Sequence, residues 1–118
     1  IGRLSAYCGA ISAGCAAGCG VAYLLGEDFE TISQTLSNSL AITSGVICDG
    51  AKASCAAKIA TAVDSGLMGY YMCKNKKNFC SGDGIVGDGI EKTIKNVGKL
   101  ASQGMRETDK VIIEIMTE

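Results

Sequence analysis

The sequence contains no histidine, no tryptophan and no proline. Without histidine, this chain cannot by itself form a Ser-His-Asp or a Cys-His nucleophile system. Imidazole is excluded as a metal ligand too, so a bound metal would need thiolates or carboxylates. The lack of proline, which breaks helices, together with abundant alanine predicts a helical protein rather than a β-sandwich.

A strong net charge is also absent. The formal charge of −1 gives no reason to expect nucleic acid or an anionic membrane surface as a partner. Most charged side chains lie in the second half, which predicts an interior first half covered by the second. The 118 residues suit one domain, 1–118, and because the first residue is Ile1 we expect a processed product or an excised domain.

The uncharged stretch from Leu4 to Gly26 is long enough to span a bilayer. It consists mainly of glycine, alanine, serine and cysteine, which insert poorly into membranes and suit the central helix of a soluble bundle. We therefore predict a helix from about Leu4 to Leu25, ending at Gly26. Its several glycines indicate a close approach, either by neighbouring helices or by a bulky cofactor.

The remaining helices are predicted from capping residues and periodicity. Asp28 is the expected N-cap of a second helix that ends near Gly45. A third helix should start near Ala53 or Ser54, and its inner line is Cys55, Ile59, Ala62, Gly66, Gly69 and Cys73. The prediction is an all-α fold, a compact bundle of about five helices around the central Gly/Ala/Cys-rich helix.

Asp88 and Glu91 form a candidate capping box for the fourth helix. The glycine-rich run before it lacks the Lys-Ser/Thr ending and the preceding strand of a phosphate-binding loop. Gly104 is expected to break the fourth helix. A short final helix would then bury Val111, Ile112, Ile115 and Met116.

Seven cysteines are an odd number and cannot form a complete set of disulfides, so reduced thiols and a cytoplasmic location are expected. Cys48 and Cys55 bracket a turn of small residues, which lets both sulfurs approach one centre. Their spacing is not that of a known zinc or ferredoxin motif, so metal binding and simple burial both stay open. Cys8, Cys15 and Cys19 share one side of the first helix, while Cys73 and Cys80 are expected to be core or surface thiols.

The segments 44–60, 104–110 and 113–116 resemble the L-cysteine desulfidase family, which is related to the iron–sulfur L-serine dehydratases. The resemblance covers essentially the whole chain, which would be the C-terminal part of a longer enzyme. It implies a 4Fe–4S cluster held by Cys8, Cys48 and Cys55, with one iron left for substrate. It also implies that a catalytic cysteine and much of the substrate pocket lie in a missing N-terminal part.

The family's activity is elimination of sulfide and ammonia from L-cysteine to give pyruvate. Lys52 would then neutralise a substrate carboxylate or contact a cluster sulfur, and Asp49 would either assist substrate binding or cap the third helix. The proposed base lies outside the chain, so the isolated chain is expected to be inactive. The expected partners are a small amino acid and the missing N-terminal part, not nucleic acid or membrane, and a homodimer stays open.

Two other functions remain open at this stage. The first is an L-serine dehydratase domain with the same cluster. The second is a non-catalytic helical domain whose cysteines only pack the core, in which case Cys48→Ser would leave the fold and the spectrum unchanged.

Overall fold

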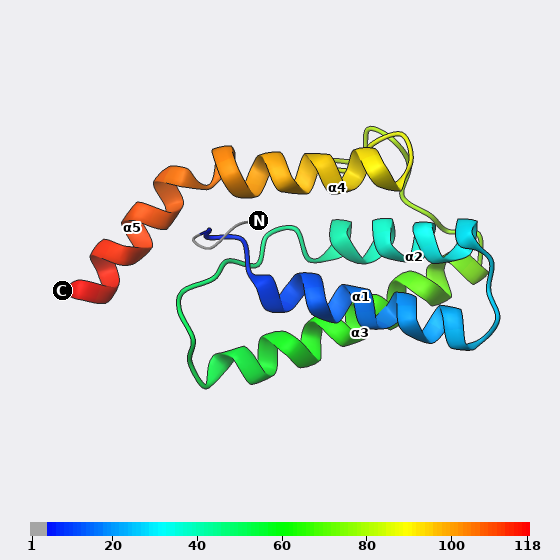
Figure 1. The fold of residues 1–118 in the computed structure, drawn as a ribbon, viewed down its shortest axis with the longest axis horizontal. Helices are drawn as coiled ribbons and strands as arrows, with labels where there is room; N and C mark the ends of the chain where they lie inside the picture. The colour runs from blue at the N-terminus through cyan, green and yellow to red at the C-terminus, as the bar shows by residue number, and fades with distance from the viewer. Residues whose placement is uncertain (1–4) are drawn as a thin grey trace.

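The computed structural model describes residues 5–118, which form five α-helices (Figure 1). These are α1 (Gly9–Leu24), α2 (Phe29–Ile42), α3 (Ser54–Lys74), α4 (Ile90–Lys99) and α5 (Arg106–Thr117), and a π-helical segment η1 (Leu100–Gly104) joins the last two. In this part of the chain no strand forms, apart from one isolated antiparallel bridge between Tyr7 and Ile47. The all-α prediction is confirmed.

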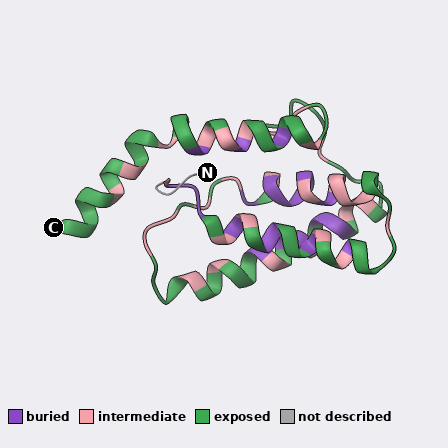
Figure 2. Ribbon diagram, viewed as in Figure 1, coloured by how far each residue is buried: buried purple, intermediate pink, exposed green. Residues whose placement is uncertain are grey.

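The core lies where α1, α2 and α3 pack together, with α4 beside α2. Figure 2 shows the buried residues gathered in these helices, while α5 leaves the bundle at one end. The buried hydrophobic cluster consists of Tyr7, Cys8, Ile11, Cys15, Leu40, Ala62, Val97 and Ala101. Among residues 5–118, no helix is both long and apolar enough to cross a membrane.

Glycines allow α1 and α3 to approach backbone to backbone. A Cβ atom on Gly18 would lie 2.5 Å from the carbonyl carbon and oxygen of Gly66 in α3. A Cβ on Gly14 would overlap Ala62 in the same helix. Of the two explanations for the glycine-rich helix, the structure therefore supports close helix packing at these two positions.

Three predicted helix boundaries are confirmed. Gly26 has a φ of 80° just beyond the end of α1, a conformation that glycine adopts without steric cost. Asp28 is the N-cap of α2, and its Oδ1 accepts a hydrogen bond of 2.9 Å from the backbone N–H of Thr31. α3 also begins where expected, at Ser54.

Other boundaries differ from the prediction. Leu4, the predicted start of the first helix, lies outside the described residues, and α1 begins only at Gly9. Residues 6–8 are instead paired with residues 46–48, so their backbone hydrogen bonds go to that segment. α2 ends at Ile42 rather than near Gly45. The side chain of Thr43 bonds back to the carbonyl of Ser39 at this end.

The predicted capping box at Asp88 does not form. Gly89 is the N-cap of α4, with a φ of 81° and no side-chain cap. Thr93 instead holds the preceding loop against α4, because its hydroxyl accepts a hydrogen bond from the backbone N–H of Gly87. The capping pattern therefore marked the start of the helix to within two residues but not the interaction that stabilises it.

The buried edge predicted for the last helix is wrong, although the helix itself forms. No residue of α5 is buried, and Ile115 is 65% exposed. The reason is that α5 contacts no helical element other than η1 in the described chain. Similarly, Ile59 on the predicted inner line of α3 is half exposed, whereas Ala62, Gly66 and Gly69 are buried as expected.

Glu27, in the turn between α1 and α2, ties this end of the bundle to α3. Its Oε1 accepts hydrogen bonds from Lys74 Nζ at 2.8 Å and from Tyr70 Oη at 2.7 Å. Both hydrogen bonds hold the pKa of Glu27 below its ordinary value, and the bond from Lys74 has the larger effect.

We therefore expect a pH-dependent contribution of Glu27 to stability. Because its pKa is lowered in the folded state, the contribution is present above the ordinary glutamate pKa of about 4.3 and is lost as the pH falls through the lowered value. Glu27→Gln should lower the urea midpoint at pH 7 and change it little near pH 3. An equal loss at both pH values would show that the carboxylate charge plays no part.

Candidate metal centre

The backbone pairing beside α1 places Cys8 and Cys48 on the same side of a short ribbon. The N–H of Cys48 bonds to the carbonyl of Ala6 at 2.6 Å, and the N–H of Cys8 bonds to the carbonyl of Val46 at 3.4 Å. Side chains alternate between the two faces of extended chain, so Tyr7 and Ile47 face one way and both cysteines face the other. Such diagonal neighbours lie roughly 7–8 Å apart. Cys8 is buried, and Cys48 packs against the core cluster that contains it.

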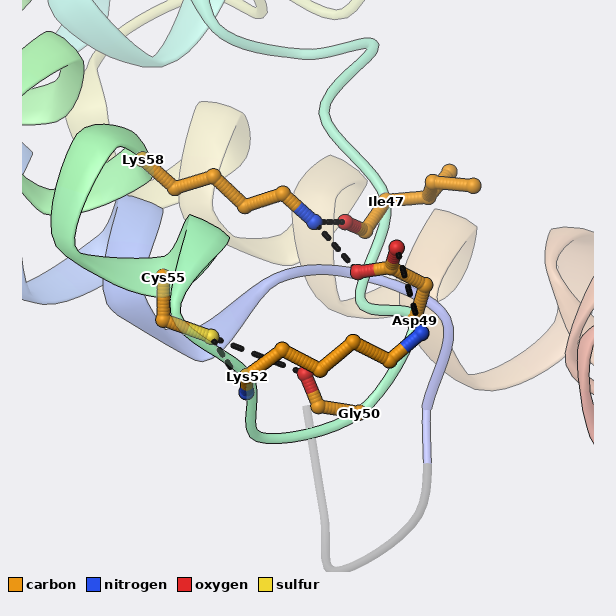
Figure 3. Close-up of polar contacts among 6 residues, drawn as sticks. All are labelled: Ile47, Asp49, Gly50, Lys52, Cys55 and Lys58. Atoms are coloured by element: carbon orange, nitrogen blue, oxygen red, sulfur yellow. Dashed lines mark hydrogen bonds and ion pairs between the residues drawn. The ribbon is translucent and has the colours of Figure 1, made fainter. Parts of the chain in front are cut away.

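Cys55 lies at the start of α3, across the turn from Cys48. Its Sγ contacts two backbone groups of the turn, the N–H of Lys52 at 3.4 Å and the carbonyl oxygen of Gly50 at 3.5 Å (Figure 3). Gly50 has a φ of 95°, which lets the chain reverse between the two cysteines. Cys55 is half-buried and is not part of a disulfide.

Lys58 is the residue of this region that the sequence analysis missed. Its Nζ donates hydrogen bonds to Asp49 Oδ1 at 2.6 Å and to the backbone carbonyl of Ile47 at 2.9 Å (Figure 3). The contact with Asp49 raises the pKa of Lys58, and the charges of Cys8 and Cys55 add to that effect. The sequence did contain one indication of this role, because Lys58 follows Cys55 by three residues and that spacing puts both side chains on one side of a helix.

Asp49 and Lys52 both take part in this network. The hydrogen bond from Lys58 is the main reason why the pKa of Asp49 lies below its ordinary value. Lys52 Nζ lies 3.8 Å from Asp49 Oδ2. Asp49 does not cap α3, because the N-cap is Ala53 and no side chain bonds there. The side chain of Lys52 is about half exposed, so its ammonium is accessible from solvent.

The other cysteines lie elsewhere. Cys15 is fully buried with its Sγ 3.4 Å from Thr43 Oγ1, and the Sγ of Cys19 donates to the carbonyl of Ile32 at 3.7 Å. Burial raises the pKa of the Cys19 thiol, with a further contribution from Cys15, and burial likewise raises that of Cys73. Cys80 is exposed in the loop before α4.

Tyr7 has a buried hydroxyl with no hydrogen-bond partner in the described part of the chain. Burial raises its pKa to about 12, and the charges of Cys15 and Cys8 contribute. The hydroxyl therefore stays protonated at neutral pH and is not available there as a base.

The three predicted ligands fit an iron–sulfur cluster in donor type. All three are free thiols, the soft ligand that such clusters take. Within residues 5–118, however, no three cysteine, aspartate or glutamate side chains stand close enough to hold one metal ion. Cys55 Sγ would have to exchange its contacts with the turn for iron, and the three-cysteine site stays a prediction.

A separate cavity of about 630 Å³ lies between the start of α2 and the loop that precedes α4. Its lining includes Ser33, Gln34, Asp88 and Glu91, and none of the three predicted metal ligands. In Figure 1 these segments lie at the end of the bundle away from the turn that carries Cys48 and Cys55. The cavity is therefore not part of the candidate metal centre.

Comparison with known proteins identifies the family. Residues 1–114 match the sequence profile described as serine dehydratase alpha chain. A UPF0597 protein of Finegoldia magna is 56% identical over the whole chain, and one of Desulfitobacterium hafniense is 59% identical over 98% of it. The chain spans 28% and 27% of the length of these two relatives. No solved structure matches it. The chain belongs to the serine dehydratase alpha chain family.

Proposed function

We propose that this member of the serine dehydratase alpha chain family is the cluster-binding part of an iron–sulfur lyase acting on L-cysteine. The reaction breaks the Cα–H and Cβ–S bonds, releases sulfide and leaves aminoacrylate. Tautomerisation to the imine and addition of water then give pyruvate and ammonia, so the step needs no external oxidant or reductant.

The observation that carries the proposal is the placement of free thiols around one turn. Cys8 and Cys48 lie on two segments whose backbones pair, and Cys55 lies in the first turn of the helix that follows. The match to the serine dehydratase alpha chain family supports an elimination from a small amino acid, and the resemblance of residues 44–60 to the L-cysteine desulfidases supports L-cysteine as the substrate.

In this proposal the chain supplies ligands and charge rather than a base. Cys8, Cys48 and Cys55 would hold a 4Fe–4S cluster, which supplies an iron free of thiolate as a Lewis acid for the substrate carboxylate and leaving group. Lys52, with its accessible ammonium, would neutralise that carboxylate, and Asp49 would keep both lysines in place. The base would come from outside the chain, as the family resemblance implies, and the chain itself has no histidine for that role.

A second candidate is deamination of L-serine, which the description of the matching family favours. The two reactions differ only in the group that leaves Cβ, sulfide or hydroxide. The two are distinguished by the rates at which a longer protein containing this chain releases sulfide and pyruvate from L-cysteine and pyruvate from L-serine. Equal or faster turnover of L-serine would make the second candidate correct.

Anaerobic reconstitution of the chain with iron and sulfide tests the cluster site. We expect about four irons per chain and charge-transfer absorbance in the visible range for the unmodified chain. Cys8→Ser, Cys48→Ser and Cys55→Ser should each abolish most of this uptake, because each removes one of three thiolate ligands.

Cys73→Ser is the matched control, since Cys73 lies at the far end of α3 and should leave uptake unchanged. The proposal is contradicted if Cys48→Ser takes up as much iron as the unmodified chain, or if no form takes up any. The reconstituted chain should also release no pyruvate from L-cysteine, and measurable release would show that the base lies within it.

A further inference from the structure

Lys58 contacts both neighbours of Cys48. Its Nζ binds the carbonyl oxygen of Ile47, the residue before this cysteine, and the carboxylate of Asp49, the residue after it. Figure 3 shows the lysine reaching from α3 to these two groups. One side chain therefore links the backbone before Cys48 and the side chain after Cys48 to α3.

The same lysine is linked to the other two predicted ligands. Cys55 lies three residues earlier on α3, on the same side of the helix. Cys8 pairs through its backbone with the segment that Lys58 holds. The side chain is 21% exposed, so solvent screens its charge less than it does that of Lys52.

We propose that Lys58 is the positioning residue of the three-cysteine site. It keeps Cys48 in register with Cys8 and Cys55, and it supplies the positive charge that offsets the negative charge of the thiolates and of the bound cluster. This inference rests on the proposed function, because it assumes that the three cysteines bind a cluster. A purely structural ion pair would explain the contact with Asp49 but would have no effect on the properties of the cluster.

Two substitutions that break the same ion pair separate these explanations. Lys58→Met removes the positive charge, and Asp49→Asn removes the negative one while keeping an oxygen that accepts a hydrogen bond. If charge at the cluster matters, the midpoint reduction potential of the bound cluster should fall in Lys58→Met and rise in Asp49→Asn. A positive charge favours the reduced, more negative cluster, and a negative charge disfavours it.

The second readout is the rate at which an iron chelator removes the cluster under anaerobic conditions. We expect loss about tenfold faster or more in Lys58→Met, the usual effect of removing a group that orients metal ligands. Lys58→Arg keeps the charge and should recover most of the stability of the cluster. Lys74→Met is the matched control, because Lys74 is also on α3 in an ion pair but lies at the other end of the helix.

The outcomes distinguish the two proposals. If the unmodified chain binds no cluster, the proposed function fails and the role of Lys58 fails with it. If the unmodified chain binds a cluster but Lys58→Met matches Lys74→Met in both potential and rate of loss, only the inference about Lys58 is overturned. The same holds if Lys58→Met and Asp49→Asn shift the potential in the same direction. If Lys58→Met does not fold, Asp49→Asn and Lys58→Arg still test the effect of charge.

Discussion

Replacing Gly18 by alanine is expected to destabilise the chain by about 3 kcal/mol, at the upper end of the usual cost of overpacking. The added Cβ would lie 2.5 Å from backbone atoms of Gly66, which cannot rotate away as a side chain can. α1 and α3 would have to separate along their crossing, and the contacts of the core near Cys15 and Ala62 would loosen. Urea or thermal unfolding followed by circular dichroism at 222 nm measures the loss.

Gly20→Ala provides a control on the same helix. No atom lies within 4 Å of a Cβ at this position, so alanine meets no neighbour. Alanine is the better helix former by about 1 kcal/mol, and Gly20→Ala should therefore stabilise the chain. If both substitutions change stability in the same direction, the close crossing of α1 and α3 is incorrect.

Asn38→Leu should cost about 2–4 kcal/mol, because several buried polar groups would lose their partners. Asn38 is fully buried in α2. Its Nδ2 donates to the carbonyl of Gly69 in α3 and to Asn78 Oδ1, both at 3.0 Å. Its Oδ1 accepts from Gln34 Nε2 and from the backbone N–H of Phe79, both at 3.1 Å. This amide therefore joins two helices and the loop that follows them.

Asn75→Leu is the matched control. Asn75 is exposed, and its side chain donates a hydrogen bond to the carbonyl of Tyr71 one turn earlier. A surface substitution of this kind usually changes stability by less than about 0.5 kcal/mol. Denaturant unfolding of both variants tests the prediction, and a loss in Asn38→Leu no larger than that in Asn75→Leu would contradict it.

Local signals accounted for much of the helical framework. Asp28 and Gly26 mark helix ends because capping and a positive φ depend on neighbouring residues alone. The glycines of α1 also indicated a close approach, although not which neighbour would make it. Asp88 shows the limit of such signals, since the loop before α4 bonds to Thr93 instead.

The candidate site was predicted only in part. The turn with Cys48 and Cys55 stood out from the sequence, and the family resemblance added Cys8. Nothing local to the chain showed that residues 6–8 would pair with residues 46–48. Lys58 was missed because its role depends on two groups of a segment about ten residues earlier, which only folding brings to it.

By itself the sequence determined the helical class, the exclusion of histidine chemistry within this chain and the turn that carries Cys48 and Cys55. These follow from composition and from contacts between near neighbours along the chain. Only the tertiary structure decided that Cys8 lies beside Cys48, that Lys58 holds the segment around Cys48, and that α5 buries no residue. The physical reason is that pairing and burial depend on the surface that each segment meets, and residues distant in sequence provide that surface.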